Sequence, residues 1–239
     1  MLALCAGLSS TASATQSATI STVFKPERLG APTTVSLGFQ ISAPGEQVPS
    51  PLTGFDFHYP SNLGIATSGL GVASCPIAEL EAHGPSVCPP DSRMGSGSAF
   101  VKIPVGGEVE TETASIALVA GPPQGRFVRV LVGVTGLSPV IARIVMPSLL
   151  LAGDLRLTVP LVESLPGAPY VSVVSVHVTI GGNLTYYERR HGRTVAYHPE
   201  GIGLPRTCPR GGFRFSASFS FLDGTQAQAR RTVACPRRR

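Results

Sequence analysis

Nine residues near the end of the chain, Phe213–Phe221, alternate between apolar and polar side chains. Phenylalanine stands at positions 213, 215, 219 and 221 with alanine at 217, and arginine and three serines fill the places between them. Because successive side chains of a strand point to opposite faces of its sheet, this order puts four rings on one face. The segment is predicted to be a strand whose aromatic face lies in a core.

Period-two patterning is the dominant periodic signal along the rest of the chain as well. The 27 Gly and 22 Pro leave few windows long enough for a helix and mark many turns. Only Pro76–Ala82 has helical character. Roughly a dozen short strands with turns between them predict an all-β fold, an antiparallel β-sandwich of immunoglobulin-like or jelly-roll type. The further strands are expected at Thr19–Phe24, Thr33–Ser42, Gly54–His58, Ala99–Ile103, Thr113–Val119, Arg126–Val134, Val140–Met146, Leu155–Val159 and Val171–Ile180.

Short turn signals predict two hairpins. Asp223-Gly224 is a favoured type I′ dipeptide, after which Thr225–Ala234 returns as the partner of the phenylalanine strand. The second hairpin joins Leu184–Arg189 to Arg193–Tyr197 and reverses at His191-Gly192.

Four of the five cysteines are each followed by proline, and they form one pair in the first half of the chain and one near its end: Cys75, Cys88, Cys208 and Cys235. Pairing about the last turn puts Cys235 opposite Gly212, so we expect a Cys208–Cys235 disulfide. The other pair would close the segment that holds the helix. Zinc binding is less favoured because C-x-x-C spacing is missing. Disulfides of this kind are typical of exported proteins, and each could contribute about 2–4 kcal/mol.

Residues 1–14 have the features of an export signal. A short apolar run precedes Ala12-Ser13-Ala14, which fits an A-x-A cleavage site, although no basic residue precedes the run. Cys5 would be removed with this segment. No later stretch reaches the roughly 18 apolar residues of a membrane helix. Residues 15–239 are expected to form one domain; the alternative is two small β domains with a boundary near 159–169, where Pro160, Pro166 and Pro169 occur.

Several stretches resemble uncharacterised secreted β-sandwich proteins of high-GC actinobacteria. They are Phe24-Lys25-Pro26-Glu27-Arg28-Leu29-Gly30, Pro49-Ser50-Pro51-Leu52-Thr53-Gly54, and the region from Leu184-Thr185-Tyr186-Tyr187-Glu188-Arg189 to Cys208-Pro209-Arg210-Gly211-Gly212-Phe213. The resemblance covers most of the chain after residue 14. It implies export and an all-β fold, and it carries no known activity, cofactor or catalytic residue.

Catalytic and metal-binding patterns are weak. Gly95-Ser96-Gly97-Ser98 lacks the first glycine of a hydrolase nucleophile elbow, and the five histidines are scattered. A glycosidase needs two carboxyl groups across a cleft; nothing in the sequence pairs the candidates, which are Asp56, Glu163, Glu188 and Glu200. Glu108, Glu110 and Glu112 would share one face of a strand, as a calcium-binding stripe or, more simply, as a charged outer face. We expect no catalytic residue, metal or cofactor.

Positive charge gathers in the last part of the chain. Residues 151–239 contain twelve Arg or Lys and five Asp or Glu. The clusters predict a salt-dependent anion-binding surface at Arg189, Arg190, Arg193, Arg230 and Arg231; a solubilising basic surface is the simpler interpretation.

Three functions remain open at this stage. The first is a non-catalytic secreted or cell-surface protein with a structural or binding role, whose partner is an anionic cell-wall polymer or another surface protein. A secreted carbohydrate-active hydrolase is the second, and polyanion binding without specific nucleic-acid recognition is the third.

Overall fold

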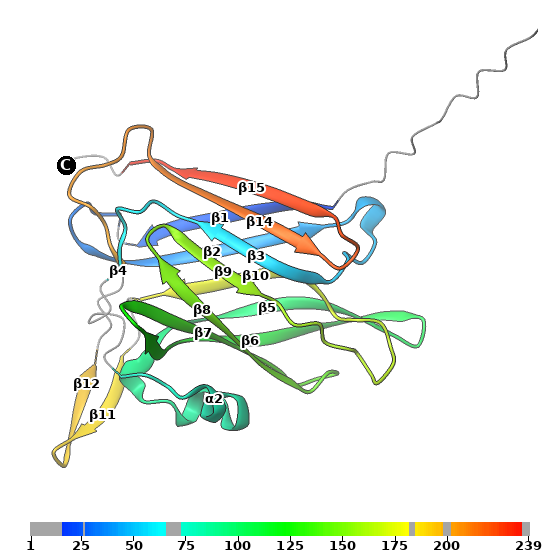
Figure 1. Cartoon of the computed structure of the whole chain (residues 1–239), viewed down its shortest axis with the longest axis horizontal. Coiled ribbons are helices and arrows are strands. Elements are labelled where there is room, and N and C mark those ends of the chain that lie inside the picture. Colours follow the sequence, from blue (N-terminus) through cyan, green and yellow to red (C-terminus); the bar gives the residue numbers. More distant parts are fainter. Residues whose placement is uncertain (1–15, 26, 66–72, 182–184, 198–201, 236–239) are drawn as a thin grey trace, which may run out of the picture.

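The computed structural model describes residues 16–25, 27–65, 73–181, 185–197 and 202–235. Antiparallel β-structure dominates, which confirms the predicted fold class (Figure 1). The strands are β1 (Ser17–Lys25), β2 (Pro32–Ser42), β3 (Leu52–His58), β4 (Gly64–Ile65), β5 (Arg93–Val105), β6 (Glu108–Gln124), β7 (Phe127–Gly136), β8 (Ala142–Leu151), β9 (Asp154–Thr158), β10 (Ser172–Ile180), β11 (Tyr186–Arg190), β12 (Arg193–Tyr197), β13 (Ile202–Gly203), β14 (Phe213–Phe221) and β15 (Gln226–Val233). The α-helix in the described residues is α2 (Ile77–His83), with single 3-10 turns at Pro44–Glu46, Pro85–Val87 and Pro90–Ser92.

One sheet of 13 strands curls almost completely around on itself. Eleven of these strands form the wall, in the spatial order β1, β2, β10, β5, β6, β7, β8, β9, β3, β14, β15, while β13 and β4 extend it beyond β2. In Figure 1 the wall is seen as two layers, with β1, β2, β3, β14 and β15 above β5 to β8. The fold is thus a flattened, nearly closed barrel with the layered form of a sandwich.

The barrel closes at a seam between β1 and β15, which lie side by side with no backbone ladder recorded between them in the described chain. Gln16, just before β1, ties one end of this seam through its side chain. Its amide nitrogen donates to Asp223 Oδ2 (3.3 Å) and Thr225 Oγ1 (3.0 Å). Its amide oxygen accepts from the backbone N–H of Ser50 (2.8 Å). A buried polar side chain is therefore satisfied on three sides, as burial requires.

The phenylalanine strand has the predicted orientation. The five odd-numbered residues of β14 are all buried, and the four polar residues between them are only partly buried or exposed. Phe24 from β1 contacts two rings of β14, with centroids 5.3 Å from Phe213 and 6.1 Å from Phe215. Aromatic packing of this kind holds β1 to the upper layer although the seam lacks a ladder.

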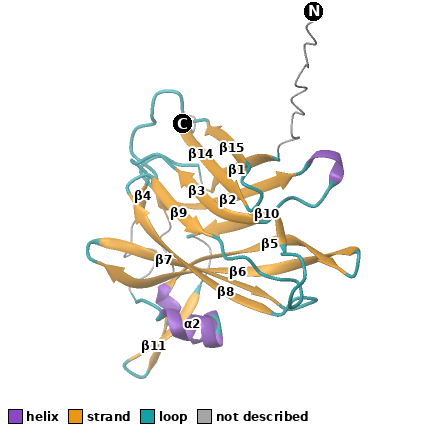
Figure 2. Cartoon of the chain, turned by 45° about the vertical axis from the view of Figure 1, so that its right-hand side comes forward, coloured by secondary structure: helices purple, strands orange, loops and turns teal. Residues whose placement is uncertain are grey.

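A second apolar cluster lies outside the barrel, on the outer face of β6 and β7. Helix α2 covers it from below in Figure 2. Leu80 of the helix, Val119 of β6 and Leu131 of β7 meet there, each with at most 1 % of its surface exposed. The helix matches the predicted Pro76–Ala82 closely, and it depends on this cluster because seven residues are too few to be helical alone.

Two disulfides are present. Cys75 and Cys88 have Cα atoms 5.0 Å apart and belong to the cluster under α2. Cys208 and Cys235 have Cα atoms 5.9 Å apart and join the approach to β14 to the end of β15. Both separations lie in the usual range for a bridge, so the expected Cys208–Cys235 pair is formed. These bonds indicate an oxidising compartment.

The turn between β14 and β15 differs from the prediction. Gly224 has φ +80°, but Asp223 does not have positive φ, as a type I′ turn requires. Instead the Asp223 carboxylate accepts the backbone N–H of Thr225 (2.9 Å) and stabilises a longer loop. Phe213 therefore pairs with Val233, one residue away from the register that put Cys235 opposite Gly212.

The β11–β12 hairpin is as predicted, with φ of 48° at His191 and 77° at Gly192.

Candidate functional site

The inner faces of the two layers meet beside β10 but are separated in the middle of the barrel. Side chains that point inward from the strands should be fully buried in a filled barrel, yet Leu37, Phe39, Phe55, Leu157 and Met146 are only partly buried. Two separate core clusters result, one on each layer. The side chains between them face an open space.

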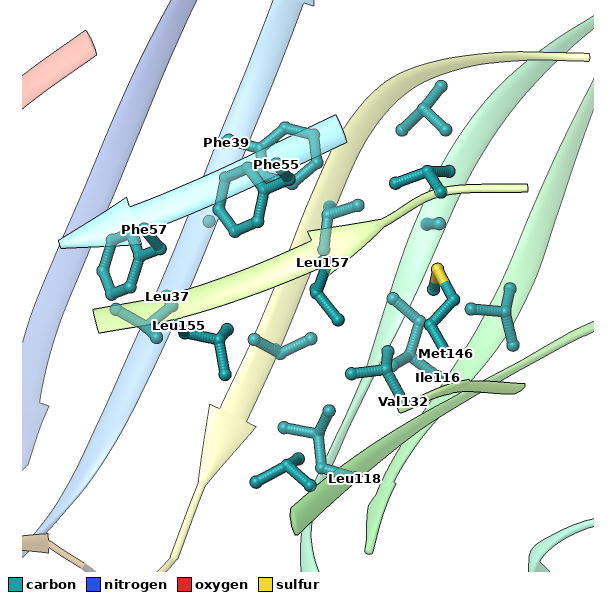
Figure 3. Close-up of a pocket in the computed structure, with 18 of the residues that line it drawn as sticks. Leu37, Phe39, Phe55, Phe57, Ile116, Leu118, Val132, Met146, Leu155 and Leu157 are labelled. Carbon is teal, nitrogen blue, oxygen red and sulfur yellow. The ribbon is translucent and has the colours of Figure 1, made fainter. Parts of the chain in front are cut away.

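This space is a cavity of about 270 Å³. Figure 3 shows the rings of Phe39, Phe55 and Phe57 on one side of it and Ile116, Val132 and Met146 on the other. Leu155 and Leu157 of β9 lie between these two groups. Further inward residues from β2, β5, β7, β8 and β10 complete the wall, among them Leu37, Val101, Val134, Ile144, Leu150, Val176 and Val178.

The lining is almost wholly apolar. Among the described residues, no charged side chain lines the cavity, and side-chain oxygens come only from Ser21 and Tyr59. A buried water needs several polar partners, which this wall does not offer. The cavity therefore suits an apolar occupant.

The size of the cavity follows from the number of strands. Barrels of about eight strands have an interior that side chains just fill or that holds one small ligand, and diameter grows with strand number. With eleven strands in the wall, side chains from opposite layers cannot fill the middle. An engineered cavity of about 150 Å³ is enough to bind benzene, so the present one has room for a larger molecule.

A second hollow adjoins the cavity at one end, and we call it the rim hollow. It has a volume of about 240 Å³ and is lined by Tyr59, Ser61, Leu63, Arg126, Val128, Leu150, Leu151, Ala152 and Gly153. Tyr59, Leu63 and Leu150 line both spaces and form the boundary between them.

Tyr59 is held firmly at this boundary. Its hydroxyl donates to the carbonyl of Leu151 (2.6 Å), and its backbone N–H donates to the carbonyl of Gly153 (2.8 Å). Burial raises the pKa of the Tyr59 phenol, and the nearby Asp154 carboxylate adds to this increase. The phenol is therefore neutral at physiological pH.

The carboxylates considered for a hydrolase are not brought together where the structure describes them. Asp56 lies on the outer face of β3 and pairs with Arg156 of β9 (2.9 Å). Glu163 is exposed in the β9–β10 connection and accepts the backbone N–H of Gly167 (2.9 Å). Glu200 and the side chain of Glu188 lie outside the described part of the chain.

The expected glutamate stripe is wrong at one position. Glu108 and Glu110 are exposed, but Glu112 is 7 % exposed. One Glu112 oxygen accepts the backbone N–H groups of Leu137 (2.6 Å) and Ser138 (3.1 Å), and the other accepts that of Val140 (3.3 Å). Glu112 is a structural group that fixes the β7–β8 loop, because a carboxylate readily satisfies several backbone donors.

The predicted arginine surface divides between two places. Arg189, Arg190 and Arg193 lie on the projecting β11–β12 hairpin, whereas Arg230 and Arg231 lie on β15 in the opposite layer (Figure 1). Arg190 also pairs with the buried carboxylate of Asp91 (3.5 Å). Anion binding by either group stays a prediction. In the described chain no three His, Cys, Asp or Glu side chains gather as metal ligands would.

Comparisons with known proteins give no relative: no family model, no curated protein and no solved structure matches the chain. No helix in the described residues combines the length and apolar character of a membrane span. The predicted leader, residues 1–14, and the arginines at 237–239 lie outside the described residues.

The sequence does not predict the cavity, because the alternating pattern of inward-facing side chains is the same whether or not those side chains meet across the barrel. A signal was nevertheless present. Roughly a dozen strands had been expected, and a single closed wall of that many strands is wider than side chains can fill.

Proposed function

We propose that the protein is an exported, non-catalytic binding protein that holds an apolar ligand inside its barrel. The cavity supports this best, because it is large, enclosed by strands from both layers and lined by apolar side chains. Pockets that bind small molecules are typically concave and mostly apolar, with a few polar groups that orient the ligand. A ligand would also add van der Waals contacts to the apolar side chains that border the space.

Export rests on three observations. The two disulfides indicate an oxidising compartment. Residues 1–14 have the small-residue pattern of a leader, and the resemblance noted above is to secreted proteins. Binding is favoured over hydrolysis because Asp56 and Glu163 lie apart on the outer surface, so the described carboxylates offer no pair across a cleft.

A neutral fluorescent probe tests the proposal directly. N-phenyl-1-naphthylamine emits strongly in apolar surroundings and carries no charge, so it reports the cavity alone. We expect saturable binding of one probe per protein. Phenylalanine at both Val132 and Leu157, which point into the cavity in Figure 3, should weaken binding at least tenfold by occupying the space.

A matched control is Val195→Phe on the exposed β11–β12 hairpin, which should leave probe binding unchanged. Thermal unfolding of all variants verifies that they are folded. Binding that does not saturate, or that is equally strong in the filled variant, would disprove the proposed function.

A further inference from the structure

The rim hollow differs in chemistry from the cavity that it adjoins. Its polar groups are the Ser61 hydroxyl, the backbone of the β8–β9 turn and the guanidinium of Arg126. At the boundary formed by Tyr59, Leu63 and Leu150, the lining changes from polar to apolar. A molecule that crossed this boundary would have a polar end in the rim hollow and an apolar end in the cavity.

The cavity runs away from this boundary along β9. Leu155 lines it at the end near Tyr59, and Leu157, Val159 and Val162 line it further along the chain. At about 3.3 Å per residue, Leu155 to Val159 alone span about 13 Å. The apolar lining therefore continues at least this far from the polar end, which is room for an extended apolar chain.

Arg126 gives the polar end its charge. It lies in the turn between β6 and β7, which reaches the same end of the barrel as the β8–β9 turn (Figure 1). Its guanidinium carbon lies 5.4 Å from the ring centroid of Phe127, a cation–π contact that holds the side chain in place. Among the described residues, it forms no ion pair with a carboxylate.

No carboxylate of the described chain pairs directly with this guanidinium, although Asp154 is close enough to act on Tyr59. The Asp154 carboxylate, next to the β8–β9 turn, pairs with His58 on the outer face of β3. The Tyr59 phenol is neutral at physiological pH because burial raises its pKa. An arginine is well suited to a carboxylate or phosphate group, which it can bind with two parallel hydrogen bonds.

We infer that the ligand is a single-chain amphiphile with an anionic head, whose tail fills the cavity and whose head lies beside Arg126 in the rim hollow. The inference rests on the proposed function, since it needs a cavity that binds. It adds the ligand class and the direction in which the ligand lies.

Dodecanoate and dodecanol form a matched pair for the test, with the same chain and a charged or neutral head. Each is titrated against protein saturated with N-phenyl-1-naphthylamine, below its aggregation limit and at low ionic strength. We expect dodecanoate to displace the probe at lower concentration than dodecanol. Arg126→Gln should weaken dodecanoate about fivefold, because an exposed pair is worth up to about 1 kcal/mol, and should leave dodecanol unchanged. The difference should vanish at high salt.

Arg129→Gln is the matched control. Arg129 lies in the same hairpin, but it alternates with Val128 and Val130, which line the rim hollow and the cavity, and it binds Gln124 (2.8 Å). This variant should bind dodecanoate and dodecanol as the wild type does. If Arg126→Gln leaves dodecanoate unchanged while N-phenyl-1-naphthylamine still saturates, the head site is wrong and the cavity stands. If neither N-phenyl-1-naphthylamine nor dodecanoate binds, by fluorescence or by calorimetry, both proposals fail.

Discussion

Strands β6 and β7 have apolar side chains on both faces, and the two faces are packed differently. On the outer face, Val119 and Leu131 are covered by α2 and the Cys75–Cys88 bridge and have no exposed surface. Packing there is so close that a Cβ atom at Gly121 would lie 2.9 Å from Leu131 Cγ. On the inner face, Ile116 and Val132 border an open cavity.

The difference shows that the open interior is not a general looseness of this chain. The same two strands, with the same kinds of residue, pack to full density when a helix and a disulfide lie against them. Inside, the described side chains of the two layers leave a space between them. The cavity therefore follows from the width of the barrel.

The largest expected difference in stability is between a leucine truncated on the outer face of the wall and a leucine truncated on its inner face. Leu80→Ala removes a fully buried side chain from the outer cluster and should lower the free energy of unfolding by about 3 kcal/mol. Leu157→Ala only enlarges a space that already exists, so we expect a loss of about 1 kcal/mol. Urea unfolding of both variants, without added ligand, measures the contrast. Equal losses would mean that the interior is as well packed as the outer cluster.

An intermediate difference in stability is expected when a valine on each face is replaced by the larger phenylalanine. Val119→Phe has no room under α2 and should destabilise the protein by about 2 kcal/mol through overpacking. Val132→Phe enters the cavity and should leave stability unchanged or slightly raised. Thermal unfolding at matched pH compares the two, and a lower melting temperature for Val132→Phe than for Val119→Phe would contradict the comparison.

The smallest effect is expected at the boundary of the cavity. Tyr59→Phe loses the hydrogen bond to Leu151 and should cost about 1 kcal/mol near neutral pH. Because the folded-state pKa of Tyr59 is raised above the unfolded value of 10.0, its contribution is complete below pH 10 and is lost as pH rises through the folded pKa. The difference between wild type and Tyr59→Phe in urea unfolding should therefore shrink above pH 10. A constant difference would show that the phenol does not titrate differently on folding.

Local signals in the sequence were sufficient for the strands. The order of phenylalanine and serine in β14 decides which face is buried, and His191-Gly192 can adopt the two positive φ values that its turn needs. Each of these depends on neighbours a few residues away. The helix α2 and the Cys208–Cys235 disulfide are also predicted correctly, although α2 is stabilised by distant residues and the disulfide joins positions 27 residues apart.

Features that depend on distant parts of the chain could not be placed in advance. Glu112 appeared to belong to an outer stripe, and its partners are 25 to 28 residues further along. Arg126 is predicted only as the first residue of a strand, and the pairing of β7, β8, β9 and β3 side by side brings it to the same hollow as Tyr59. The cavity itself is set by how many strands share one wall, which no single segment encodes.

The position of Gln16 has a practical consequence for preparing the protein. Two segments, the one at Ser50 and the β14–β15 loop with Asp223 and Thr225, are held by this one side chain just before β1. A recombinant version trimmed to begin at residue 17 would leave the backbone N–H of Ser50 without its acceptor and release one end of β1 from β15. Expression boundaries should therefore be set upstream of residue 16, with a cleavable spacer before it.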